Sequence, residues 1–169
     1  MTKKTRRLTY SALIAALYVA LTYLQNFILP GTTSMVIQVR AAEALCVLAF
    51  FTPSAVWGLT VGCLLFNISY AHTLPLDFFM GTAASFLAVG SMYLTRKATV
   101  FGYPLLGMLM PALFNAFLIG WELSIYIGGA FWVNAMYVAI GELISLLLLG
   151  SLLYYTIRKR HIDAWLRSI

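Results

Sequence analysis

The chain has 169 residues, of which 62% are hydrophobic and only 9% are charged. An ordinary soluble domain carries roughly 25% charged residues, and eleven basic and five acidic side chains are too few to cover a soluble surface of this size. The composition excludes a soluble globular domain and predicts a single all-α membrane domain over residues 1–169.

The first predicted element is a membrane helix over residues 8–29. These 22 residues contain no charge, and about 20 apolar residues are enough to cross the hydrocarbon core of a bilayer. Four basic residues precede the segment, which is longer than the apolar core of a signal peptide and lacks a small-residue cleavage site. We therefore expect a start-transfer span whose basic flank stays in the cytoplasm.

Small residues repeat along this first helix. Ala12, Ala16 and Ala20 are spaced four apart, which places them on one face. Small residues at this spacing let another helix approach closely. The pattern is common in membrane helices, and it predicts a docking strip for a partner helix.

Residues 30–40 form a predicted external loop rich in helix breakers, and this loop could cap a vestibule. The stretch after it is either one long helix or two short ones, 40–51 and 53–68. Proline cannot donate to the helical ladder and disfavours helix in the residue before it, so Pro53 makes a break plausible but not compulsory.

Charge decides between these alternatives, because basic residues near span ends favour the cytoplasm. Three further helices are predicted at 75–95, 104–120 and 131–157. With six spans, ten of the eleven basic residues lie inside and only Arg40 lies outside. With five spans, four lie inside and seven outside. We therefore predict a six-helix bundle with cytoplasmic N- and C-termini.

Four acidic residues fall in or beside these apolar segments. Glu43, Asp77 and Glu122 lie near the predicted outer helix ends, while Glu142 lies near mid-depth. A charge at the bilayer centre costs roughly 2.5–3.5 kcal/mol and usually faces the bundle interior, where it carries function. Internal pairing is the simpler explanation for any one of them, but four acids cannot all be neutralised by one outer base. We predict an outward-opening binding cluster that also includes Arg40, Asn67, Asn115 and Asn134.

The remaining residues give weaker evidence for function. Trp132 is as consistent with an interfacial aromatic belt as with stacking on a flat ligand. Cys46 and Cys63 are expected to be small buried hydrophobes rather than a disulfide or metal site. No phosphate loop, HExxH motif or nucleophile–base pair is present, so we predict no enzymatic activity, no metal site and no cofactor held by this chain.

Several segments resemble the QueT branch of the S components, which are the substrate-binding subunits of energy-coupling factor (ECF) transporters. The specific segments are R-x-x-E-A-L from Arg40 and W-x-N followed by G-E-L from Trp132 to Leu143. The similarity covers residues 8–157, and the alanine strip is typical of the whole group.

This resemblance implies a multi-pass protein of the bacterial plasma membrane that binds a queuosine precursor, a 7-deazaguanine base such as 7-aminomethyl-7-deazaguanine. The first-helix alanines would dock on a transmembrane coupling subunit, and two partner ATPases would hydrolyse ATP. Glu142 or Glu43 would accept from the donor edge of the base, and Glu122 or Asp77 would hold its ammonium group. Asn67, Asn115 and Asn134 would contact the remaining ring positions.

Three alternatives stay open from the sequence. The chain could be a stand-alone secondary carrier that uses Glu142 as a proton site. It could be a structural membrane subunit without a ligand, in which the acids merely pair. It could also be an S component for another vitamin, such as riboflavin, folate or a cobalamin fragment.

Overall fold

The computed structural model describes residues 2–32, 39–70 and 76–168. Every regular element within these residues is helical. In chain order the helices are α1 (Lys3–Ile28), η1 (Ala41–Phe50), α2 (Pro53–Tyr70), α3 (Asp77–Thr95), α4 (Leu105–Tyr126), α5 (Phe131–Ile144), η2 (Ser145–Gly150), α6 (Ser151–Lys159) and α7 (Ile162–Arg167). Helices α5 and α6 form one continuous rod through η2, which is a π-helical segment.

A helix occupies each of the six ranges predicted from the sequence. Among the described residues, four helical segments are long and apolar enough to cross a membrane: α1, α3, α4 and the α5–α6 rod. The remaining two, η1 and α2, are shorter, as expected from the position of Pro53. The membrane helical class is therefore supported, while the count of six crossings stays a prediction. Two boundaries differ from the prediction: α1 begins at Lys3 instead of residue 8, and α4 continues to Tyr126 instead of ending at residue 120. The basic tail forms an additional short helix, α7.

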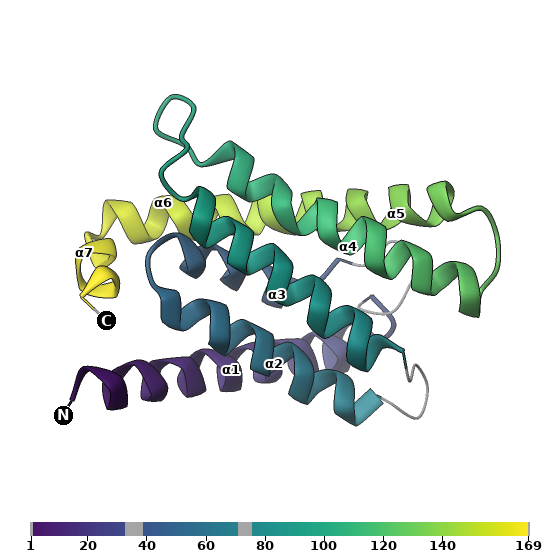
Figure 1. Ribbon diagram of the computed structural model, residues 1–169, viewed down its shortest axis with the longest axis horizontal. Helices are drawn as coiled ribbons and strands as arrows, with labels where there is room; N and C mark the ends of the chain where they lie inside the picture. The colour runs from purple at the N-terminus through teal and green to yellow at the C-terminus, as the bar shows by residue number, and fades with distance from the viewer. Residues whose placement is uncertain (1, 33–38, 71–75, 169) are drawn as a thin grey trace.

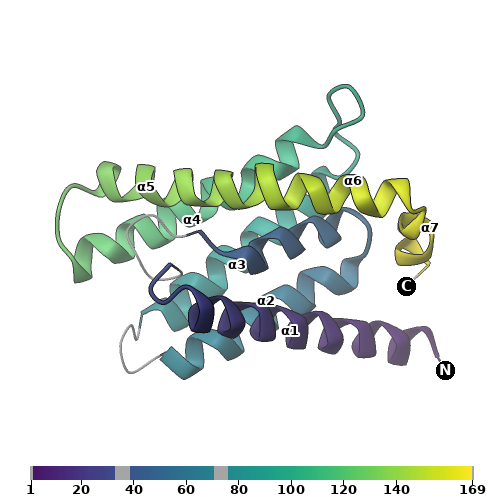
Figure 2. The ribbon, with the colours of Figure 1, turned by 180° about the vertical axis from the view of Figure 1, so that it is seen from behind.

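Successive helices run back and forth along the long axis of the molecule, and both termini lie at the same end (Figure 1). The view from behind shows the α5–α6 rod passing over η1, with α1 below it (Figure 2). An even number of passes requires this placement of the termini. The side of the membrane on which they lie is not fixed by the fold and stays a prediction.

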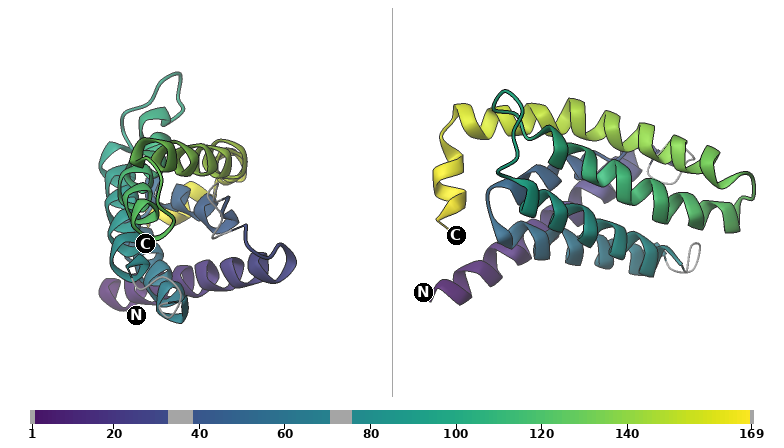
Figure 3. Two further views of the ribbon diagram at one scale, coloured as in Figure 1. Left: turned by 90° about the vertical axis from the view of Figure 1, so that its right-hand side faces the viewer. Right: turned by 45° about the horizontal axis from the view of Figure 1, so that its top comes forward.

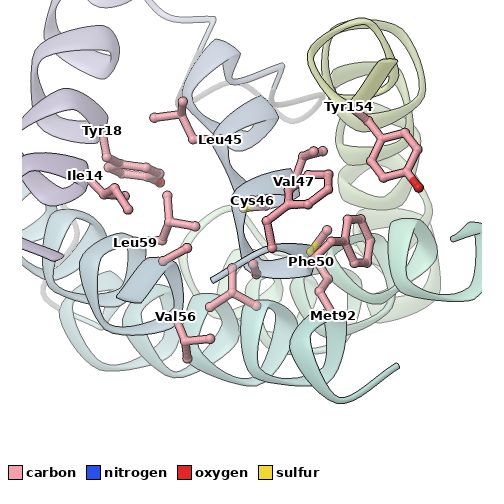
Figure 4. Packing of buried hydrophobic residues seen from close by; sticks show 14 of the residues in the cluster. Ile14, Tyr18, Leu45, Cys46, Val47, Phe50, Val56, Leu59, Met92 and Tyr154 are labelled. Carbon is pink, nitrogen blue, oxygen red and sulfur yellow. The ribbon is translucent and has the colours of Figure 1, made fainter. Parts of the chain in front are cut away.

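The short helix η1 forms the centre of the bundle. Seen along the bundle axis, it lies between the longer helices (Figure 3, left), and it packs against α1, α2, α3, η2 and α6. Its apolar side chains are buried nearly all round, with Ile14 and Tyr18 of α1 on one side and Tyr154 of α6 on the other (Figure 4). A helix that is apolar all round is expected in such a place.

The backbone of η1 is a 3₁₀ helix over ten residues. Runs of 3₁₀ helix longer than three or four residues are uncommon, and such stretches often mark a functional hinge or strain. In this geometry the side chains at i and i+3 eclipse each other. The sequence predicted a helix here but gave no signal for its tighter winding.

The break at Pro53 is present. Helix η1 ends at Phe50 and α2 begins at Pro53, so the stretch 41–68 is two helices rather than one. A proline fits the first position of a helix because the backbone N–H that it lacks has no intrahelical partner there. The hydroxyl of Thr52 accepts a hydrogen bond from the Ser54 N–H at 3.3 Å, which helps to cap α2.

Helices α1 and α2 approach closely at two glycines. A Cβ added at Gly58 would lie 2.7 Å from the Ser11 carbonyl oxygen, and one at Gly62 would lie 2.9 Å from the Cβ of Tyr18. The glycines thus allow the close packing of α1 against α2. The opposite side of α1 exposes large apolar side chains such as Leu13, as expected of a helix that faces lipid.

Candidate functional site

Glu43 lies on η1 in the middle of the bundle and is only 3% exposed. The hydroxyl of Tyr18 donates to its Oε1 at 2.9 Å, and the thiol of Cys46 donates to its Oε2 at 3.1 Å. The second contact follows from the 3₁₀ winding, which places residues three apart directly above each other. Both carboxylate oxygens of Glu43 therefore have a donor from the chain itself.

Arg40 lies at the start of η1, and two side chains from other elements hold the backbone around it. The amide of Gln25 on α1 donates to the Val39 carbonyl at 2.5 Å and accepts from the Ala41 N–H at 2.6 Å. The hydroxyl of Ser145 accepts from the Arg40 N–H at 3.1 Å. The guanidinium group is thereby presented from a fixed stretch of backbone.

The positive charge of Arg40 interacts with all four acidic residues of the cluster. Its electrostatic interactions reach carboxylates on four different helices: Glu43 of η1, Asp77 of α3, Glu122 of α4 and Glu142 of α5. Glu43 also interacts with Glu142, and Asp77 with Glu122. The fold therefore gathers four acids that are up to 99 residues apart in sequence around one base.

Asn67 and Asp77 pack together where α2 meets α3. The Asn67 amide donates to the Asp77 backbone carbonyl at 2.8 Å and to the Cys63 sulfur at 3.5 Å. Gly81 makes room for them, since a Cβ there would lie 2.5 Å from Asp77 Oδ1 and 2.6 Å from Asn67 Nδ2. The buried Oδ1 of Asn67 has no hydrogen-bond partner among the described residues.

Helices α4 and α5 contribute the other half of the cluster. The Asn115 amide donates to Oε1 of Glu142 at 2.7 Å, and both residues are buried. Glu122 is seven residues beyond Asn115 on α4 and is also buried, and this spacing places the two residues on one inward face of the helix. Within the described part of the chain, Oε2 of Glu142 and both carboxylate oxygens of Glu122 lack a hydrogen-bond partner.

Two of the predicted site residues lie apart from this cluster. Trp132 is 70% exposed and packs edge-on against Phe131 and Phe117, which places it on the outer surface. The Asn134 amide donates to the Ser124 hydroxyl at 3.2 Å and to the Gly128 carbonyl at 3.0 Å, so it holds the turn between α4 and α5. These contacts place Trp132 at the surface and Asn134 at the turn, and a role for either residue in ligand binding stays a prediction.

The predicted docking strip lies on the outside of α1. Ala12, Ala16 and Ala20 are exposed, whereas Ala15 and Tyr18 of the same helix face the bundle. The strip is therefore open to a partner helix and lies on the opposite side of α1 from the acidic cluster.

Three contributing residues gave no clear signal in the sequence: Tyr18, Gln25 and Ser145. Each is a neutral polar residue inside an apolar run, and such residues are common in membrane helices. Only their long-range partners reveal their roles. A hint was available for Tyr18, since a buried tyrosine hydroxyl usually finds a hydrogen-bond partner.

The remaining sequence predictions concern cysteines, metals and loops. Cys46 and Cys63 are free and buried, as expected. In the residues for which coordinates are described, no group of three histidine, cysteine or acidic side chains could hold a metal ion. Most of the predicted capping loop, at residues 33–38, lies outside the described residues.

The gathered groups suit the binding of a polar solute within a membrane bundle. Comparison of the chain with known protein families matches QueT, described as the QueT transporter, over residues 8–159. No significant match was found among curated proteins or among solved structures. The match covers nearly the whole chain, and it agrees with the resemblance carried by the segments around Arg40 and Trp132. The chain therefore belongs to the QueT transporter family.

Proposed function

We propose that this chain is the substrate-binding S component of an ECF-type importer in the bacterial plasma membrane. Its substrate would be a queuosine precursor, a 7-deazaguanine base such as 7-aminomethyl-7-deazaguanine. Partner subunits would hydrolyse the ATP, because the chain carries no phosphate-binding loop of its own. The proposal rests on family membership for the transport class and on the acidic cluster for the substrate.

The observation that carries the substrate assignment is a set of four acceptor atoms that have no donor among the residues the structure describes. They are both carboxylate oxygens of Glu122, Oε2 of Glu142 and Oδ1 of Asn67, all buried. A buried acceptor left unpaired costs about 1–3 kcal/mol, and charged groups cost more. A ligand rich in N–H donors would satisfy these atoms. A guanine-like base offers adjacent N–H donors on one edge, and an aminomethyl group adds a cation.

The cluster divides into two regions that suit the two ends of such a base. Glu142 has one carboxylate oxygen held by Asn115 and one left over for the donor edge of the ring. Glu43 is less suited to this role, because Tyr18 and Cys46 already occupy its two oxygens. We assign the ammonium group to Glu122, with Asp77 beside it, and place Asn67 against the remaining ring positions.

The exposed alanine strip supports the partner assignment. Small side chains at Ala12, Ala16 and Ala20 leave a smooth, lipid-facing surface on which a helix of a coupling subunit could pack closely. Tyr18, on the opposite side of α1, contacts Glu43 of the acidic cluster. One helix would thus contact both the partner and the binding site.

Calorimetric titration of the purified full-length chain with 7-aminomethyl-7-deazaguanine tests the substrate assignment. Guanine and riboflavin serve as controls, and a cooperative thermal unfolding transition verifies that the protein is folded. We expect tight binding of the 7-deazaguanine base, with guanine and riboflavin binding much more weakly. Absence of binding by folded protein would overturn the substrate assignment. Substrate uptake into vesicles that lack any ATPase would instead favour a stand-alone carrier.

A further inference from the structure

A second candidate binding site lies away from the acidic cluster. A groove of about 590 Å³ runs between the N-terminal halves of α1 and α2. Its walls are mainly apolar and include Leu8, Ala12, Pro53 and Val61. The groove is therefore built to hold an apolar chain rather than a polar solute.

The mouth of this groove is basic. Lys4 and Arg7 both line it and are three residues apart on α1, so they share one face of the helix. No carboxylate lines the groove. The charge at the mouth is thus complementary to an anion.

The groove also lies where a lipid headgroup would be. It starts at the end of the bundle that carries both termini (Figures 1 and 2), and Trp57 lines it while remaining 61% exposed. Tryptophan and basic residues gather at the boundary between hydrocarbon and headgroups. Ser54, another lining residue, is buried, and its hydroxyl lacks a hydrogen-bond partner in the described ranges.

We propose that this groove binds one anionic phospholipid, with an acyl chain against Leu8, Ala12 and Val61 and the phosphate between Lys4 and Arg7. The apolar walls account for the chain, and the two cations account for the charge of the headgroup. The site is separate from the acidic cluster but shares Ala12 with the alanine strip, and the proposal does not depend on the identity of the transported substrate.

Binding of phosphatidylglycerol to the full-length chain in detergent, measured by native mass spectrometry, tests the proposal. Phosphatidylcholine with the same acyl chains and free glycerol phosphate serve as comparisons. A basic residue near an anionic surface changes affinity roughly fivefold, so the double variant Lys4→Gln/Arg7→Gln should bind phosphatidylglycerol about thirtyfold more weakly. Ala12→Leu, which fills part of the groove and keeps both cations, should also weaken binding.

The matched control is Lys97→Gln/Lys159→Gln, which removes two exposed charges outside the groove. We expect this variant to bind phosphatidylglycerol as the wild type does. Equal losses in the control and the groove variant would mean general attraction to basic surface and would overturn the proposal. Equal binding of the two phospholipids, tight binding of glycerol phosphate or an unaffected Ala12→Leu variant would each overturn it as well.

Discussion

At the scale of single residues, the central question is which carboxylate meets which end of the substrate. Glu122 is 2% exposed, and neither of its oxygens has a donor in the described part of the chain. Glu142 shares the burial but has one oxygen held by Asn115. The two glutamates thus have the same side chain but differ in how many carboxylate oxygens remain free to accept a hydrogen bond from the substrate. The same substitution at each position can therefore separate their roles.

We predict that Glu122→Gln weakens binding of 7-aminomethyl-7-deazaguanine about tenfold to a hundredfold, because a hydrogen bond to a charged group contributes roughly 1.5–3 kcal/mol. The same variant should bind the neutral 7-cyano analogue nearly as the wild type does. Glu142→Gln should weaken binding of both bases, since both present the same donor edge. Calorimetry with the two ligands checks this pattern. Equal effects of Glu122→Gln on the two bases would exclude its role at the ammonium group.

The charged part of the site was predictable from the sequence, and its supporting residues were not. A charge inside an apolar run is costly, so Glu43 and Glu142 stood out without any structure. Gln25 and Ser145 are neutral, and they matter only because the fold places them against the backbone on either side of Arg40. Such contacts join residues 16 and 105 positions apart, and no local pattern encodes them.

At the scale of elements, periodicity predicted where the helices lie but not how they are wound. The apolar runs and Pro53 located η1 and α2 correctly. The 3₁₀ winding of η1 and the π-helical winding of η2 occur in two segments that pack against each other across the bundle, and no local pattern in the sequence predicted either winding. Helix α4 ends at Tyr126, shortly before Gly128 and Gly129, both of which have positive φ. Left-handed glycines commonly follow the C-terminus of a helix.

Helix α1 provides the second prediction, since it presents the alanine strip on its exposed side. We expect Ala16→Trp to abolish copurification of the coupling subunit while ligand binding stays within about twofold, because a bulky side chain prevents close helix approach. Ala83→Trp is the matched control. Ala83 is exposed on α3, which does not belong to the strip, so copurification should be unchanged. Pull-down from membranes that contain the partner subunits measures the effect, and retention of the partner by Ala16→Trp would show that it docks elsewhere.

At the scale of the whole molecule, the distribution of basic residues predicts which end of the bundle faces the cytoplasm. The packing of the helices does not determine this orientation. The fold places both termini and the segment 96–104 at one end of the bundle, and the turn 127–130 at the other (Figure 1). Nothing in the helix packing distinguishes inside from outside. Basic residues near span ends favour the cytoplasm, so the ten-to-one distribution expected for six spans predicts that the end with the termini faces the cytoplasm.

Cysteine accessibility in intact cells tests this orientation, and the chain offers a clean background for it. Its two native thiols are only 3% and 1% exposed, so a membrane-impermeant maleimide should not label the wild type. Lys97 and Ala130 are exposed. They belong to the segment 96–104 and to the turn 127–130, which lie at opposite ends of the bundle (Figure 1). We expect Ala130→Cys to be labelled in intact cells and Lys97→Cys only after permeabilisation. If the stretch 41–68 made a single crossing, the later helices would be inverted and the two variants would exchange behaviour. Labelling of Lys97→Cys in intact cells would therefore contradict the six-span orientation.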